Sequence, residues 1–157
     1  MPGKRIVIVL IATALLLGLP TPLPAAPRPQ VEIDAATYTV DSNSDAADAN
    51  VGDGICATAA GTCTLRAAIQ EANQDGTAST VRFASQTDIT PGTYLPPILG
   101  NNTIIDASDQ WNGTWPYGRP GVRITYNNAS LGLLTIGADY CVVRGIEFSG
   151  SNSVECC

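Results

Sequence analysis

The chain has 157 residues, with 8 lysines and arginines against 14 acidic residues and a formal net charge of -6. It has no histidine, which excludes the Ser-His-Asp and Cys-His mechanisms and the common histidine metal centres. The acidic surface repels nucleic-acid phosphates and anionic lipid, so we expect no nucleic-acid partner. Carboxylate, arginine and calcium chemistry remain.

The N-terminus has the plan of a secretory signal peptide. Lys4 and Arg5 precede an apolar run from Ile6 to Leu17, and small residues follow at Ala25 and Ala26. This run is too short for a bilayer core, which needs about 20 residues. The sequence therefore predicts a secreted or cell-surface protein with no membrane contact after signal cleavage. Its expected parts are a signal peptide over 1–25, a Pro-rich linker over 26–36 and one domain over 37–157.

An acidic stretch follows the linker. Asp41, Asn43 and Asp45 give the D-x-N-x-D opening of a calcium loop. However, Ala46 stands where an EF-hand needs glycine, and Gly52 stands where it needs the bidentate glutamate. The metal candidate is therefore an irregular calcium site at the first three residues, with a solvated acidic turn as the alternative. No other cofactor is expected.

Five cysteines in an exported chain favour disulfide formation. Cys56 and Cys63 enclose a Gly-containing loop of six residues, and we predict that they form a bridge worth about 2–3 kcal/mol. A zinc site would need paired C-x-x-C motifs or histidine, and the chain has neither. Cys141 falls where an inward apolar residue is expected, which predicts a buried free thiol. Cys156 and Cys157 are left unassigned.

A short amphipathic helix is predicted directly after the second cysteine. Four apolar residues spaced at i, i+3, i+4 and i+7 form one stripe, namely Leu65, Ala68, Ile69 and Ala72. Thr64 is a natural N-cap, and Asp75-Gly76 supplies a stop. So short a helix is not stable alone, so the stripe is expected to cover apolar strands that follow.

The segment around this helix resembles a known family. The run C-T-L-R-A-A-I-Q-E-A-N, preceded by G-D-G-x-C, is similar to the CSLREA domain at the start of exported bacterial right-handed parallel β-helix proteins. The resemblance covers about residues 37–106 and includes the Leu-Pro-x-Ile segment of the family at Leu95 to Ile98. Ala67 stands where the family has the glutamate of a capping box, which weakens the helix start by about 0.5–1 kcal/mol.

Short apolar-alternating clusters recur along the rest of the chain. Phe83, Ile104, Ile124 and Ile146 are spaced by 21, 20 and 22 residues, a plausible length for one solenoid coil. With the family resemblance, this predicts a mainly β fold: the start of a right-handed parallel β-helix (solenoid) with a short N-terminal capping α-helix. The chain is then expected to continue into further coils. The alternative is a β-sandwich with irregular loops.

Two groups of residues are candidates for binding or catalysis. Aromatic rings in the D-Q-W-N-G-T-W-P-Y-G segment could stack on sugars or form the small core of a loop; these are Trp111, Trp115 and Tyr117. Acids and arginines of the kind used by β-helix polysaccharide lyases lie nearby, at Asp106, Asp109, Arg119 and Arg123. Their R-P-G-V-R segment does not match the arginine motif of those lyases.

We therefore expect a non-catalytic exported β-helix module with a structural, adhesive or carbohydrate-binding role. Its expected partner is a polysaccharide or another cell-envelope component. Two alternatives stay open: the capping end of a β-helix polysaccharide lyase or hydrolase, and a calcium-stabilised binding module.

Overall fold

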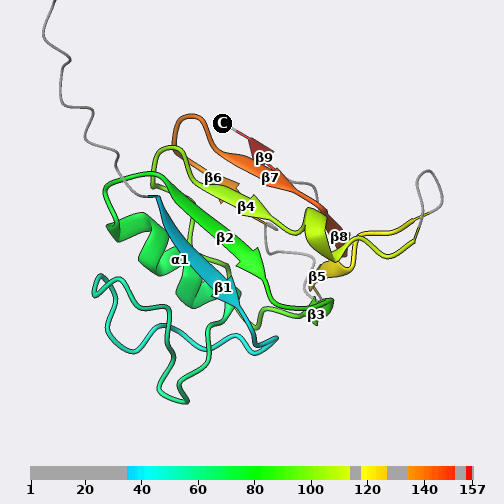
Figure 1. Cartoon of the computed structure of the whole chain (residues 1–157), viewed down its shortest axis with the longest axis horizontal. Helices are drawn as coiled ribbons and strands as arrows, with labels where there is room; N and C mark the ends of the chain where they lie inside the picture. The colour runs from blue at the N-terminus through cyan, green and yellow to red at the C-terminus, as the bar shows by residue number, and fades with distance from the viewer. Residues whose placement is uncertain (1–34, 114–117, 127–133, 151–154, 157) are drawn as a thin grey trace, which may run out of the picture. The chain divides into compact units, whose positions relative to one another are not determined.

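Short parallel strands and one α-helix make up most of the regular structure in the described chain (Figure 1). The computed structural model describes residues 35–113, 118–126, 134–150 and 155–156. All of them lie in one compact unit, Glu32–Cys157. The predicted signal peptide, 1–25, lies outside the described residues, and so does most of the linker. No helix in the described part is long and apolar enough to cross a membrane.

The elements follow one another in short steps, and the first strand begins at the end of the predicted linker. In chain order they are β1 Ala36–Val40, α1 Leu65–Gln74, β2 Ser79–Phe83, β3 Thr87–Ile89, β4 Ile104–Asp106, the 3-10 helix η1 Ser108–Gln110, β5 Val122–Tyr126, β6 Thr135–Ile136, β7 Val142–Arg144, β8 Ile146–Gly150 and β9 Glu155–Cys156.

The strands form three parallel sheets. The first sheet has the order β1-β2-β4-β7, the second β3-β5-β8, and the third β6-β9. All six pairs between named strands are parallel. The alternative of a β-sandwich, whose sheets are antiparallel, is therefore wrong. The chain visits first, second and third sheet in turn, since β4, β5 and β6 are followed by β7, β8 and β9.

The strand register differs from the predicted repeat. Thr80 pairs with Ile104, and Ile104 with Val142, at separations of 24 and 38 residues. The predicted series also mixes two sheets, because Ile124 and Ile146 belong to β5 and β8 of the second sheet. The period of 20 to 22 residues is therefore wrong. Parallel pairing requires only that neighbouring strands be in register. The segments that connect them lie on the surface and can vary in length, so the spacing along the sequence need not be constant.

The apolar core lies inside these sheets and under α1. The four stripe residues of α1 are each at most 1% exposed, and they share one cluster with the inward side chains of β1 and β2. The predicted helix is confirmed and extends two residues further, to Gln74. The Asp75 amide donates to the Glu71 carbonyl, and Gly76 takes φ 66°, a left-handed conformation suited to glycine.

Candidate functional site

The loop between β1 and α1 is joined covalently to the start of the helix. Cys56 and Cys63 form the predicted disulfide, with their Cα atoms 5.1 Å apart. Thr64 is the N-cap, and its hydroxyl accepts from the Ala67 amide at 3.0 Å. The same hydroxyl donates to the Ala46 carbonyl at 2.6 Å. Ala67 itself is fully buried, and the helix start is held by a second loop contact instead of a capping-box carboxylate.

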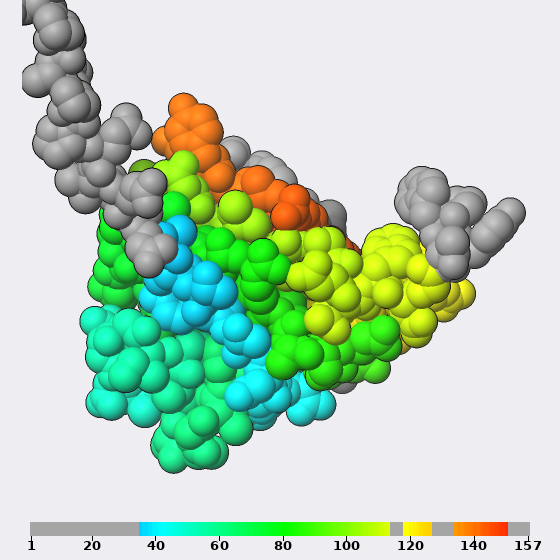
Figure 2. All heavy atoms as spheres, viewed as in Figure 1, coloured from blue at the N-terminus to red at the C-terminus, as the bar shows by residue number. Residues whose placement is uncertain are grey.

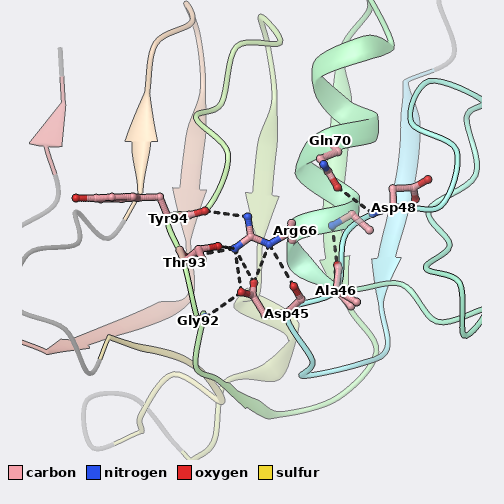
Figure 3. Close-up of polar contacts among 10 residues, drawn as sticks. Asp45, Ala46, Asp48, Arg66, Gln70, Gly92, Thr93 and Tyr94 are labelled. Carbon is pink, nitrogen blue, oxygen red and sulfur yellow. Dashed lines mark hydrogen bonds and ion pairs between the residues drawn. The ribbon is translucent and has the colours of Figure 1, made fainter.

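Arg66 ties three separate segments together (Figure 3). Its Nε and Nη2 donate to the two carboxylate oxygens of Asp45 at 2.9 Å each. Nη1 and Nη2 also donate to the Tyr94 carbonyl at 2.8 Å and the Thr93 hydroxyl at 2.9 Å. Asp45 in turn accepts from the Gly92 amide. This group of contacts, hereafter the Arg66 latch, joins α1 to the loop before it and to the segment after β3.

One of the predicted calcium ligands, Asp45, is part of the Arg66 latch. Asp45 faces Arg66, and the Asp41 carboxylate accepts from the Cys63 amide at 2.8 Å. Asn43 is exposed. Two of the three predicted ligands therefore have protein donors, and a calcium site at Asp41, Asn43 and Asp45 stays a prediction.

A different group of acids gathers beside α1. One carboxylate oxygen from each of Asp48, Asp53 and Glu71 lies within 4.8 Å of the others. Glu71 is only 1% exposed, and its two oxygens accept from the Gly52 and Gly54 amides at 2.7 and 2.8 Å. Both glycines have positive φ, which turns their amides toward the carboxylate.

This acidic group adjoins a small hollow of about 280 Å³, which Tyr38 and Asp75 also line. Burial, together with the negative charges of Asp75, Glu71 and Asp53, raises the pKa of Tyr38 to about 12. Sequence reasoning missed the burial of Glu71. The available signal was its place beside the stripe, one helical turn after Ala67 and Ala68, whose small side chains leave room for loop backbone.

The acids and arginines considered for catalysis lie in different places. Asp106, 4% exposed, accepts from Arg144 Nη2 at 2.7 Å and from the Ser108 amide and hydroxyl. The Arg144 hydrogen bond, with those from Ser108, holds the pKa of Asp106 well below its usual range against the opposing effect of burial. Asp109 pairs with Arg82 at 2.7 Å on the exposed surface. Neither acid is brought together with Arg119 or Arg123.

Arg119 and Arg123 instead line a polar cleft of about 310 Å³ beside the second sheet. Arg123 lies between two acids at paired positions, with Nη1 4.0 Å from Asp88 and Nε 3.4 Å from Glu147. Its Nε is buried and makes no hydrogen bond to a described residue, so the Glu147 contact is an ion pair without hydrogen-bond alignment. The other lining residues are Gln86, Thr87, Asp88, Asn112, Pro120 and Gly121.

Trp111 precedes the cleft residue Asn112 in the sequence and is 36% exposed. A Cβ at Gly118 would overlap its indole, so the ring packs closely against the Gly118 backbone. This contact favours the small loop core over a fully presented stacking platform. Trp115 and Tyr117 lie outside the described residues.

Cys141 is a free thiol, as predicted, but it is half-buried rather than buried. It lies just before β7, the last strand of the first sheet. Cys156 contributes backbone to β9, and Cys157 lies outside the described residues.

Comparison of the chain with models of known protein families, with curated proteins and with solved structures finds no match.

Proposed function

We propose that the chain is the N-terminal cap and first coils of an exported parallel β-helix, acting as a non-catalytic structural module. Three parallel sheets that each gain a strand as the chain visits them in turn support this reading. The local pattern that resembles the CSLREA domain supports it too, since α1 and the disulfide occur where that family has its helical cap. Right-handed winding is part of the proposal.

The observation that carries the proposal is the burial of the α1 stripe against β1 and β2. Tyr38, Val40 and Val81 are at most 4% exposed beneath α1 and its loop. Figure 2 shows the loop between β1 and α1 as a closely packed mass below β1. The disulfide and the Arg66 latch hold this cover in place.

Such a cover has a definite physical role. The end of a stack of parallel strands exposes apolar side chains and unpaired backbone groups, which promote association with other chains. A cap makes that end of the stack non-adhesive, so that other coils can add only at the opposite end.

The test is to uncover this end by one substitution. Ile69→Glu places a charge in the stripe, and we expect increased dye binding to apolar surface and concentration-dependent association in light scattering. Gln74→Glu adds the same charge at an exposed position of α1 and is the control. Wild-type dye binding and a monomeric state for a folded Ile69→Glu variant would contradict the cap.

Carbohydrate binding is a second candidate, supported by the polar cleft with its two arginines. Arginine, carboxylate and amide groups are suited to sugar hydroxyls. Loss of polysaccharide retention in affinity electrophoresis on Arg123→Ala, with retention kept in Arg82→Ala, would support it. Equal retention of both variants would exclude this cleft.

The two remaining alternatives are less well supported. A lyase or hydrolase needs acids and an arginine together at the substrate, whereas Asp106 and Asp109 are engaged by Arg144 and Arg82 and do not line the cleft of Arg119 and Arg123. A calcium-stabilised module is favoured only by the closeness of Asp48, Asp53 and Glu71. It requires a higher melting temperature in millimolar calcium, and that rise must be lost in Asp53→Asn.

A further inference from the structure

The last strand of each of the first two sheets buries its inward side chains less than its neighbours do. In the first sheet, Val81 and Ile105 are at most 1% exposed, whereas the paired Val143 is half-buried. In the second, Ile124 is fully buried and its partner Phe148 is half-buried. Among the described residues, the apolar interior is therefore covered at the α1 end and less covered at the β7 and β8 end.

The backbone of β7 is also open on this side. The Val142 amide donates to the Thr103 carbonyl, and the Arg144 carbonyl accepts from the Ala107 amide. Backbone groups alternate along a strand, so the amide and carbonyl of Val143 point away from β4. No described strand lies beyond β7 or β8 in its sheet.

Charged residues at paired strand positions alternate in sign from strand to strand. In the first sheet, Arg82, Asp106 and Arg144 occupy paired positions and read basic, acidic, basic. In the second sheet, Asp88, Arg123 and Glu147 read acidic, basic, acidic. Each row thus ends on a charge whose opposite would continue the pattern.

We infer that the free edge of β7 and β8 binds a further β-coil, an extended segment whose strands run parallel to both. Its residues are apolar opposite Val143, Ile146 and Phe148, acidic opposite Arg144 and basic opposite Glu147. The inference rests on the proposed function, and it specifies the chemistry of the partner from the apolar columns and charge rows that end at this edge.

A second copy of the chain fits this edge less well. A two-fold contact between two β7 edges would run the strands antiparallel and would engage one sheet at a time. A head-to-tail contact would need the opposite end of the stack, where α1 and its loop pack against the first strands. A separate coil that follows the existing parallel pairing meets neither obstacle.

The test uses the full chain and two synthetic peptides of residues 138–150, each with Cys141→Ser to prevent disulfide formation. The first keeps the native charges and sets like charges opposite Arg144 and Glu147. The second carries Arg144→Asp and Glu147→Arg and sets opposite charges there. Opposite cross-strand charges stabilise a pair and like charges destabilise it, so we expect the second to bind about tenfold more tightly at low salt.

Two variants of the protein locate the peptide. Val143→Glu puts a charge in the inward column and should weaken binding of the charge-swapped peptide at least tenfold. Val142→Glu makes the same change at the neighbouring outward position, which is 43% exposed, and should leave binding within twofold. Hydrogen exchange should also show slower exchange of the β7 amides with the charge-swapped peptide bound.

Failure of both peptides to bind at millimolar concentration, or equal binding of both, would overturn the inference. Circular dichroism checks that Val143→Glu is folded, and if it is not, the comparison of the two peptides on the wild-type chain still decides. The cap test alters the opposite end of the sheets, so failure of the cap and failure of this edge give different results.

Discussion

At the scale of single residues, buried carboxylates accept hydrogen bonds from backbone amides and an arginine. Glu71 gathers two loop amides, and Asp106 gathers Arg144 with the amide and hydroxyl of Ser108. Each buried acid has several donors, as a buried charge requires. These acids stabilise the fold, so replacing them should first lower the free energy of unfolding.

The lowered pKa of Asp106 makes a contribution to stability that depends on pH. A folded pKa below the unfolded value of about 4 stabilises the protein above pH 4, and this contribution is lost as pH falls toward the folded value. Asp106→Asn should therefore cost about 1.5–3 kcal/mol at pH 7, as expected for hydrogen bonds to a charged group, and progressively less below pH 4.

Urea unfolding of wild type and Asp106→Asn between pH 2 and 7, a range chosen to span the ordinary carboxyl pKa of about 4, measures this difference. Asp109→Asn is the control, because the Arg82–Asp109 pair is exposed and should contribute at most about 0.5 kcal/mol. A difference between wild type and Asp106→Asn that does not change with pH would show that the Arg144 contact has no such role.

At the scale of elements, α1 is too short to be stable alone and depends on its attachments. Its apolar stripe is buried, its first turn is held by Thr64 and the disulfide, and its Arg66 side chain reaches two other segments. The Arg66 and Asp45 side chains are 13% and 20% exposed, so solvent screens their contact less than it screens a surface pair.

Replacing Arg66 by lysine keeps the charge but removes the two-pronged geometry. Lysine cannot make the paired contact with Asp45 and reach Tyr94 and Thr93 together, so Arg66→Lys should cost about 2 kcal/mol of unfolding free energy. Arg82→Lys is the matched control at an exposed ion pair. Chemical denaturation measures both, and equal small losses would mean that the latch does not stabilise the cap.

At the scale of the whole molecule, the two ends of the described stack are unlike. One carries α1, the disulfide and the latch, and the other ends in half-buried side chains and the outermost strands β7 and β8. Under the proposed function, this difference sets the direction in which further coils would add, away from α1.

If the protein is exported, its N-terminus and the redox state of Cys56 and Cys63 should depend on the compartment in which it is made. Expression with residues 1–25 intact in a bacterium should yield periplasmic or secreted protein whose N-terminus starts near residue 26 and whose Cys56–Cys63 bridge is formed. Expression without those residues in a reducing cytosol should leave both thiols free and lower the stability by about 2–3 kcal/mol. N-terminal sequencing and thiol labelling measure the outcome, and an uncleaved cytosolic product would contradict export.

Local features of the fold followed from the sequence alone. The disulfide depends on two cysteines close in the chain, and α1 depends on a stripe, a cap and a stop within the thirteen residues 64–76, so short-range signals were sufficient. The mainly β character also followed from alternating clusters. The coil period did not, because strand pairing depends on residues up to 43 positions apart joined by segments of variable length.

Only the tertiary structure decided the roles of the charged residues. In the sequence, Glu71 and Asp106 look like ordinary polar positions. They become buried, and gain their hydrogen-bond donors, only when distant segments pack against them. Likewise, Arg66 meets Asp45 and Thr93 from segments 21 and 27 residues away. Sequence thus determined where α1 begins, whereas long-range packing determined which charges hold it in place.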